Sequence, residues 1–295
     1  MQKITPNLWF EKDTSDAVSW YVSIFPNSKI TNHYFLYNTP SDTAELITFE
    51  VLGYEIVALG AGPMFNLNPS VSLLVTCTTK DQVDKYWKKL SQGGKALMEL
   101  GAYPFSERYV WVEDKYGLSW QLMYSNEANA RQMIRPVVMF VGDVAGKAEE
   151  AINSWTSVFP DSKINDLMRY EKGEEPDKAG TIKFGSFTLF GQEFAAMDSA
   201  HEHKFGFSEG ISFIINCDTQ EEIDQYWEKL SAVPEAEICG WLKDKFGFSW
   251  QVSPTRMLDQ LLAGTDREKI DRLTQTLLEM SKLDIAKLQA AYDGE

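Results

Sequence analysis

The sequence predicts an α+β fold made of two similar domains. The octapeptide at residues 114–121, D-K-Y-G-L-S-W-Q, returns at 244–251 as D-K-F-G-F-S-W-Q. Other segments recur in the same order, so the similarity covers most of the chain. Each copy reads as β-α-β-β-β twice, and so few amphipathic helices can cover only one face of a sheet. We therefore expect the uncovered face to curl around a partly enclosed site in each domain.

Composition and charge narrow the class of protein. A chain of 295 residues suits two ordinary domains, and an apolar content of 44% indicates a folded protein. The formal net charge of −15 argues against nucleic acid or an anionic membrane as a partner. Neither a signal peptide nor an apolar run of about 20 residues is evident. We expect a cytoplasmic protein. Its three cysteines, Cys77, Cys217 and Cys239, are too scattered for a disulfide framework or a zinc site.

The first repeat opens with a strand and a helix. Residues 4–10 read as a strand, in which Pro6 is tolerable near the start or at an edge. The next segment has apolar residues at helical spacing, and Pro26 ends it. These apolar residues are Val18, Tyr21, Val22 and Phe25. Three β-like runs follow, at about 30–37, 46–52 and 55–59.

The second half of the repeat begins with a strand at 71–76. A helix follows, with the capping box Thr79-x-x-Gln82, and the second copy has Thr219-x-x-Glu222 at the same place. The apolar face of the first helix carries Val83, Tyr86, Trp87 and Leu90. Less regular β runs then lead to the octapeptide.

The octapeptide is typical of a turn that enters a strand. Gly117 and Gly247 can take positive φ in the turn. Side chains alternate along a strand, so each Trp points to one face and each Gln to the other. The Trp side chains are expected in the core. The Gln side chains then lie either on a solvated face or on the wall of a concave site.

The domain boundaries follow from the repeat. The offset between copies is 130 at Ile4 and Ile134, and 140 at Val71 and Ile211. It returns to 130 at the octapeptide, so insertions fall in loops. We expect domains at 1–128 and 129–256, joined near 125–132, and a helical tail at 257–295. Packing of the tail against the second domain, or across both, is favoured over a partner-binding arm.

The doubled β-α-β-β-β order, the I-T-P-x-L-W-F opening, the F-P-N-S-K-I segment and the octapeptide resemble the PhnB-like family. This group carries the label 3-demethylubiquinone-9 3-methyltransferase domain, within the vicinal oxygen chelate (glyoxalase, bleomycin resistance and dioxygenase) superfamily. The resemblance implies tandem domains of paired βαβββ modules, each an open eight-stranded half-barrel, plus C-terminal helices. It also implies that the two domains form an intramolecular pseudo-dimer.

Enzymes of that superfamily hold a divalent metal with His, Gln or Glu from the cup wall. By resemblance, the ligand positions here are Pro6, Ser70 and Gln121 in one domain, and Pro136, Gly210 and Gln251 in the other. Only the two glutamines keep a suitable oxygen donor. We therefore expect no metal and no cofactor. Gly60-Ala61-Gly62 is a poor match to an S-adenosylmethionine turn, so the methyltransferase label is not adopted as an activity.

We expect each cup to bind a small molecule. The candidate ligand-binding residues are Gln121, Gln251, Leu8, Phe10, Phe65, Phe140, Phe205, Trp111 and Trp241. No catalytic residue is identified. His201-x-His203 could bind a metal or shuttle a proton, although a solvated pair is favoured. Two functions stay open: a metal-free binding module for a small, partly aromatic ligand, and a superfamily enzyme with a metal-independent or non-standard site.

Overall fold

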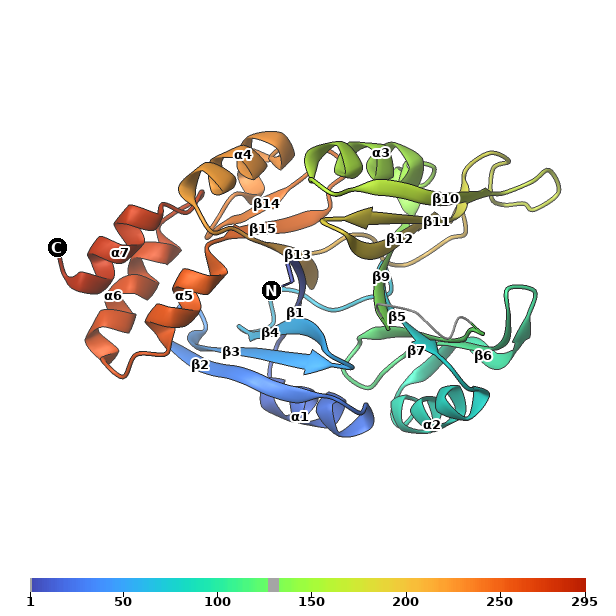
Figure 1. Ribbon diagram of the computed structural model, residues 1–295, viewed down its shortest axis with the longest axis horizontal. Coiled ribbons are helices and arrows are strands. Elements are labelled where there is room, and N and C mark those ends of the chain that lie inside the picture. Colours follow the sequence, from blue (N-terminus) through green and yellow to red (C-terminus); the bar gives the residue numbers. More distant parts are fainter. Residues whose placement is uncertain (1, 127–132) are drawn as a thin grey trace. The chain divides into compact units, whose positions relative to one another are not determined.

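The computed structural model describes residues 2–126 and 133–295 (Figure 1). Contacts divide them into two compact units. Unit 1 contains the described residues up to Val22, together with Ser28–Asn66 and Ser208–Glu295. Unit 2 contains Ser23–Asn27 and the described residues of Leu67–Phe207. Residues 127–132, in which the expected junction falls, lie outside the described part of the chain.

Unit 1 is built on a seven-stranded sheet in the order β14-β15-β13-β1-β4-β3-β2. Its strands are β1 (Ile4–Phe10), β2 (Lys29–Thr39), β3 (Asp42–Val51), β4 (Tyr54–Gly60), β13 (Ile211–Asn216), β14 (Trp241–Lys243) and β15 (Ser249–Ser253). The central strand β1 runs parallel to β4 and antiparallel to β13.

Unit 2 is built on an eight-stranded sheet in the order β10-β11-β12-β9-β5-β8-β7-β6. Its strands are β5 (Val71–Cys77), β6 (Lys95–Tyr103), β7 (Ser106–Glu113), β8 (Ser119–Tyr124), β9 (Ile134–Phe140), β10 (Lys163–Arg169), β11 (Ile182–Leu189) and β12 (Gln192–Asp198). Here β9 runs parallel to β12 and antiparallel to β5.

The strand pairing joins modules from different repeats. Unit 1 combines the first module of the first repeat, β1–β4, with the last module of the second repeat, β13–β15. Unit 2 combines the two middle modules, β5–β8 and β9–β12. The compact units therefore differ from the expected domains 1–128 and 129–256, because β1 pairs with β13 and β5 pairs with β9. The expected α+β class is confirmed: unit 2 pairs two βαβββ modules, and unit 1 pairs a βαβββ module with a module that has three strands.

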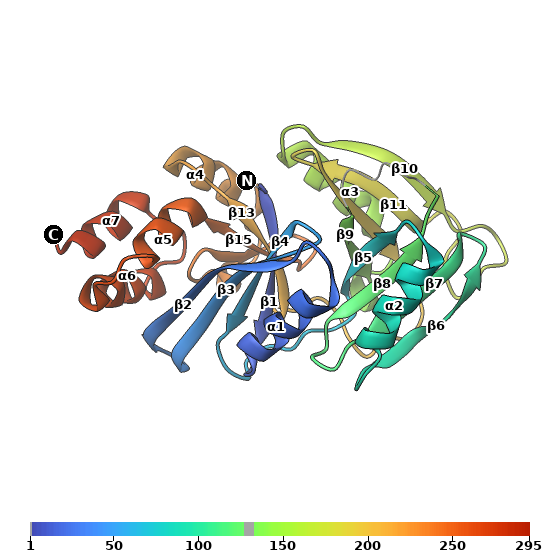
Figure 2. The ribbon, with the colours of Figure 1, turned by 60° about the horizontal axis from the view of Figure 1, so that its bottom comes forward.

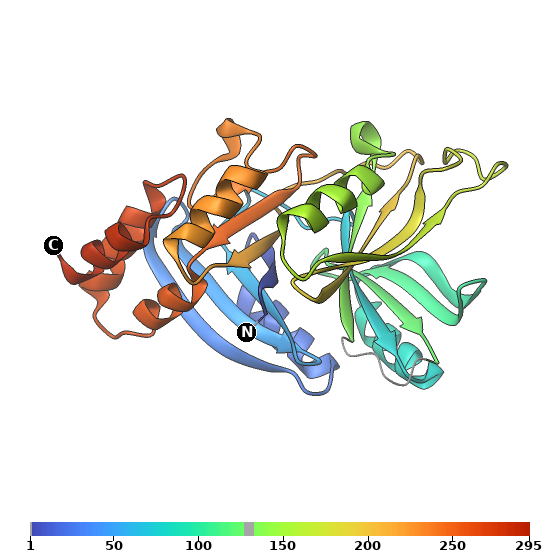
Figure 3. The same cartoon turned by 45° about the horizontal axis from the view of Figure 1, so that its top comes forward.

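Helices cover one face of each sheet. In unit 2, α2 (Lys80–Leu90) packs on β5, β7 and β8, and α3 (Ala148–Val158) packs on β10, β11 and β12. In unit 1, α4 (Gln220–Leu230) lies along β14 and β15 (Figure 3), and Tyr21 of α1 (Thr14–Ile24) stacks on Phe49. Thr79 and Thr219 form the predicted N-caps, since each accepts the backbone N–H group three residues on, whereas the side chains of Gln82 and Glu222 accept from the residue before each cap. No helix in the described ranges is long and apolar enough to cross a membrane.

The sheet of unit 1 has one strand fewer than the eight that the family resemblance implies. The offset between repeats falls from 140 (Ser72 to Ser212) to 130 (Asp114 to Asp244), so ten residues are missing from the second copy in this interval. The short 3₁₀ turn η2 (Pro234–Ala236) stands where the first repeat has β6. A second short turn, η1 (Gly142–Val144), precedes α3 in unit 2.

The C-terminal tail forms three helices on unit 1 (Figure 2). They are α5 (Thr255–Leu262), α6 (Arg267–Leu278) and α7 (Ile285–Asp293). Leucines from all three helices form a buried cluster, against which Tyr34, Leu36 and Leu46 of β2 and β3 pack. The tail also reaches the place of the missing strand, because Cys239 and Gly240 donate backbone N–H groups to Met280 (2.6 Å) and Ser281 (2.7 Å).

The repeated octapeptide is organised by its aspartate. In unit 1, Oδ1 of Asp244 accepts the backbone N–H groups of Phe246 (2.9 Å) and Phe248 (3.0 Å), and Oδ2 accepts the indole N–H of Trp250 (3.0 Å). Asp114 makes the same three bonds in unit 2. Both carboxylates are 3% exposed. The aspartate thus fixes both the turn and the core tryptophan, and the next residue, Gln121 or Gln251, points to the opposite face.

Candidate ligand-binding cavity in unit 1

The concave face of unit 1 forms a partly enclosed cavity of about 430 Å³. Strand β1 contributes Asn7 and Trp9, which lie on the face opposite Leu8 and Phe10 because side chains alternate. The registers place Val57 beside Asn7 and Leu59 beside Trp9. Strands β13–β15 add Ile214, Gln251 and Trp241. We call the part of the cavity lined by Trp9, Phe65 and Trp241 its aromatic end, the part lined by Asn7 and Gln251 its middle, and the part lined by Asp259 its acidic end.

The aromatic end is formed by three rings. Trp9 meets Phe65 edge-to-face at 5.0 Å between ring centroids, and meets Trp241 at 6.3 Å. The indole N–H of Trp9 donates to the backbone oxygen of Gly62 at 2.8 Å, which fixes the ring. Gly62 has φ +87°, a conformation that favours glycine. These rings form a rigid apolar wall suited to a flat ligand.

Two amides occupy the middle of the cavity. Nδ2 of Asn7 has no hydrogen-bond partner in the described residues, although Asn7 is only 1% exposed. Gln251 donates from Nε2 to Oγ of Ser212 at 3.0 Å. A buried donor without a partner costs free energy, so Asn7 is suited to a ligand that supplies an acceptor.

The acidic end is formed where α5 meets the sheet. Asp259 lines the cavity and has no ion-pair partner in the described parts of the chain. Burial, and secondarily the charge of Glu55, raise the pKa of Asp259 to about 6. Burial also raises the pKa of Glu55, although its hydrogen bond from Thr5 Oγ1 (3.2 Å) opposes that rise. Nearby, the hydroxyl of Thr255 is buried without a partner among the residues described.

Asp259 makes stability depend on pH. Its folded pKa lies above the unfolded value, so the protonated form stabilises the fold, and this contribution is lost as pH rises from about 4 through about 6. Asp259→Asn is therefore expected to raise the free energy of unfolding by about 1–2 kcal/mol near pH 8, after discounting for solvent screening. Near pH 4 the two proteins should be equally stable. Urea unfolding at both pH values measures this; an equal gain at both would show that the charge is not the cause.

The tail closes the cavity. Leu258 and Leu262 of α5 and Leu273 and Leu277 of α6 line it, together with Leu283 before α7. Without the tail, the apolar concave surface of β2 and β3 would lack this cover. The cavity therefore depends on a segment for which the sequence predicted packing but not a role in the site.

The corresponding face of unit 2 is packed differently. Val137 takes the place of Asn7, since Val137 pairs with Ala195 as Asn7 pairs with Val57. Val137, Ala195 and Leu74 form a buried cluster with Met123, Phe184 and Met197 packed on it. Gln121 is also satisfied: Oε1 accepts from the Tyr109 hydroxyl (2.8 Å) and Nε2 donates to Oγ of Ser72 (2.7 Å). This wall offers a ligand fewer free polar groups than unit 1.

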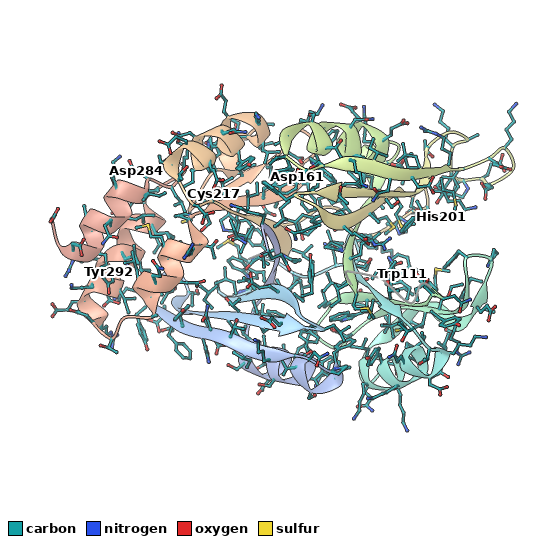
Figure 4. All side chains as sticks on the ribbon, viewed as in Figure 1. Trp111, Asp161, His201, Cys217, Asp284 and Tyr292 are labelled. Carbon is teal, nitrogen blue, oxygen red and sulfur yellow. The ribbon has the colours of Figure 1, made fainter. Side chains whose placement is uncertain are left out.

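The structure distributes the nine residues predicted as ligand contacts over several places. Gln251, Phe65 and Trp241 line the cavity of unit 1. In unit 2, Trp111 (labelled in Figure 4) pairs across strands with Gln121, and its indole N–H donates to Ser119 at 2.7 Å.

The other four predicted residues do not line the cavity of unit 1. Leu8 and Phe10 face away from it, although both are buried. Phe140 is buried in unit 2 against Trp155, and Phe205 packs on His203 at 4.9 Å. The sequence analysis missed Asn7 and Trp9, which alternate with Leu8 and Phe10. It also missed Asp259, although an aspartate next to Leu258 on an apolar helix was a usable signal.

The histidine pair lies in the loop after β12 (His201 is labelled in Figure 4). His203 Nε2 is 2.8 Å from Oγ of Ser199, and His201 is 3.6 Å from Asp177. Burial lowers the pKa of His203, and His201 reinforces this. In the described ranges, no three His, Cys, Asp or Glu side chains are grouped so as to hold a metal.

A divalent metal, which the superfamily resemblance implies, does not fit the residues of β1 and β15 at the expected ligand positions of unit 1. Pro6 pairs with Phe213 on the helix-facing side of the sheet, so the residue of β1 on the cavity wall is Asn7. The expected ligand position, Pro6, is therefore one residue away from the residue on the cavity wall. In a strand, a shift of one residue moves the side chain to the opposite face of the sheet. Asn7 presents a donor, and Gln251 is the neutral amide beside it. Such a pair does not hold a divalent cation.

The glycines of Gly60-Ala61-Gly62 serve packing. A Cβ on Gly60 would lie 2.1 Å from Oγ1 of Thr14, at the start of α1. No helix follows the turn, since residues 61–70 form a loop. The turn therefore lacks the helix N-terminus of an S-adenosylmethionine site. In unit 2 its counterpart begins with Asp198, whose Oδ1 accepts the N–H groups of Gly146 (2.7 Å) and Ala148 (3.1 Å) at α3.

Solved structures define the class of this fold. Glyoxalase I from Zea mays matches 87% of this chain and 93% of its own, with a TM-score of 0.52 and 10% identity. A candidate dioxygenase from Bacillus subtilis matches 83% of this chain and 82% of its own, with a TM-score of 0.50 and 9% identity. At such identities the likeness concerns the fold alone, which is glyoxalase-like.

Sequence comparison defines the family. The model of the family 3-demethylubiquinone-9 3-methyltransferase matches residues 2–123 and 132–253, and the chain belongs to this family. A PhnB protein from Bacillus cereus is 38% identical over 42% of this chain and 100% of its own, with a TM-score of 0.40. No curated protein sequence matches the chain. The expected PhnB-like identity and tandem organisation are thereby confirmed.

Proposed function

We propose that this chain is a cytoplasmic small-molecule-binding protein that uses the cavity of unit 1 without a metal. The observation that carries the proposal is a partly enclosed, largely apolar cavity of about 430 Å³ whose lining includes a buried amide nitrogen, Asn7 Nδ2, without a hydrogen-bond partner among the described residues. Cavities of this size and composition are typical of small-ligand sites. We also propose that the chain is an intramolecular pseudo-dimer, in which each unit receives one module from each repeat.

We expect the chain to bind one ligand, in unit 1. Unit 2 fills the counterpart of the cavity wall with Leu74, Val137 and Ala195, and its Gln121 forms hydrogen bonds at both the amide oxygen and the amide nitrogen. We therefore assign ligand binding to unit 1 and a structural role to the same face of unit 2.

Titration with N-phenyl-1-naphthylamine, a neutral fluorescent probe, tests the proposal. We expect saturable binding of one probe per chain. Trp9→Leu should weaken binding about tenfold, because it removes the ring that contacts both Phe65 and Trp241. Binding should be unchanged by EDTA.

The matched control is Met139→Leu. Met139 holds the position in β9 that Trp9 holds in β1, since Met139 pairs with Met197 as Trp9 pairs with Leu59. This variant should bind the probe like the natural protein. No saturable binding, or equal weakening by both substitutions, would refute the assignment to unit 1.

A further inference from the structure

The charged residues that line the cavity all carry acidic side chains. Three acidic residues line it, Glu209, Glu235 and Asp259, and none of the described lining residues is Lys, Arg or His. Glu209 is neutralised by Lys243 at 2.8 Å, and Glu235 is exposed at the rim. Asp259 is half-buried, and within the described residues it has no ion-pair partner. An anion entering this cavity would therefore meet repulsion without a compensating cation.

The groups that face Asp259 strengthen this asymmetry. Glu55 of β4 lies close enough for its charge to affect Asp259. The hydroxyl of Tyr34 on β2 donates to the backbone oxygen of Asp259 at 3.3 Å, and within the described residues the carboxylate oxygens of Asp259 accept no hydrogen bond. Two carboxyl groups in a partly dehydrated site repel each other, and a bound cation would relieve the repulsion.

We propose that the cavity selects an organic cation: a flat apolar body held at the Trp9 end, with a protonated amine at the carboxylate of Asp259. This inference rests on the proposed function and adds the ligand class to it. The Trp9, Phe65 and Trp241 rings supply the apolar wall, and Asn7 Nδ2 can donate to an oxygen in the middle of the ligand. At about pH 8 the carboxyl of Asp259 is ionised, because its pKa of about 6 lies well below.

Three probes of one shape and different charge test the proposal by displacing N-phenyl-1-naphthylamine near pH 8. They are 4-(1-naphthyl)butylamine, the corresponding alcohol and the corresponding carboxylate. We expect the amine to bind about tenfold more tightly than the alcohol, and the carboxylate to bind most weakly. Lowering the pH to about 5 should reduce the advantage of the amine, since Asp259 then takes up a proton.

Asp259→Asn isolates the carboxylate. It should remove most of the advantage of the amine and leave the affinity for the alcohol unchanged. Glu268→Gln, which removes the same charge from the exposed side of α6, should preserve the order of the three probes.

Equal affinity of the natural protein for amine and alcohol would overturn the proposal, as would equal weakening of both by Asp259→Asn. If the neutral probe itself failed to bind, the proposed function would fall instead. The two failures are therefore distinguishable.

Discussion

Asp244→Ala is expected to lower the free energy of unfolding by about 3–5 kcal/mol. The substitution leaves three buried donors without an acceptor: the backbone N–H groups of Phe246 and Phe248, and the indole N–H of Trp250. Each such donor costs about 1–3 kcal/mol when it is neither bonded nor hydrated. Water can recover part of this at the turn, which keeps the total below the sum. Urea unfolding followed by tryptophan fluorescence measures the loss.

Asp244→Asn separates hydrogen bonding from packing. The amide has nearly the size of the carboxylate, but its NH₂ group must face either the two backbone N–H groups or the indole N–H. We expect Asp244→Asn to lower the free energy of unfolding by more than half as much as Asp244→Ala does. Glu228→Ala, on the exposed face of α4, should change stability by less than about 0.5 kcal/mol. An asparagine variant as stable as the natural protein would show that the acceptor role is unimportant.

The same bonds explain why the octapeptide was informative in the sequence. Asp114 and Asp244 need a glycine at positive φ three residues later and an indole six residues later, so the residues are tied together locally. Local requirements of this kind can be recognised from sequence. The N-caps at Thr79 and Thr219 could be predicted for the same reason, because each cap bond joins residues that are close in the sequence.

Pairing between modules could not be predicted in this way. The apolar patterns of β5 and β13 are nearly the same, so on pattern alone either strand could pair with β1. Only the three-dimensional structure shows that β1 takes β13 while β5 takes β9. The residues of the site could not be predicted for the same reason. Asn7 and Gln251 belong to different repeats, and they line one cavity only because β1 pairs with β13.

The sequence also could not predict which face of β1 lines the cavity. All seven residues of β1 are buried, so burial does not distinguish the face of Leu8 and Phe10 from that of Asn7 and Trp9. Asp259 was missed for a different reason. Its position depends on how the tail packs on β2 and β3. Helical periodicity predicts an apolar face, but it does not predict which element that face packs against.

Leu288→Ala tests whether the tail is part of the binding site. Leu288 of α7 is 0% exposed within the leucine cluster and does not itself line the cavity. Truncation should cost about 2–4 kcal/mol through lost burial and a residual void. Because α6 packs on α7 and also lines the cavity, loosening α7 should weaken the binding of N-phenyl-1-naphthylamine about tenfold. Unfolding and probe titration measure the two effects.

Ile30→Ala is the matched control, since Ile30 lies on β2 in the same unit but is 42% exposed. It should change neither stability nor affinity appreciably. If Leu288→Ala lowered stability and left probe affinity intact, the tail would be only a support for the sheet. A ligand that restored the stability of Leu288→Ala on binding would instead show that cavity occupancy and tail docking are coupled, because a ligand that binds only the docked state stabilises that state.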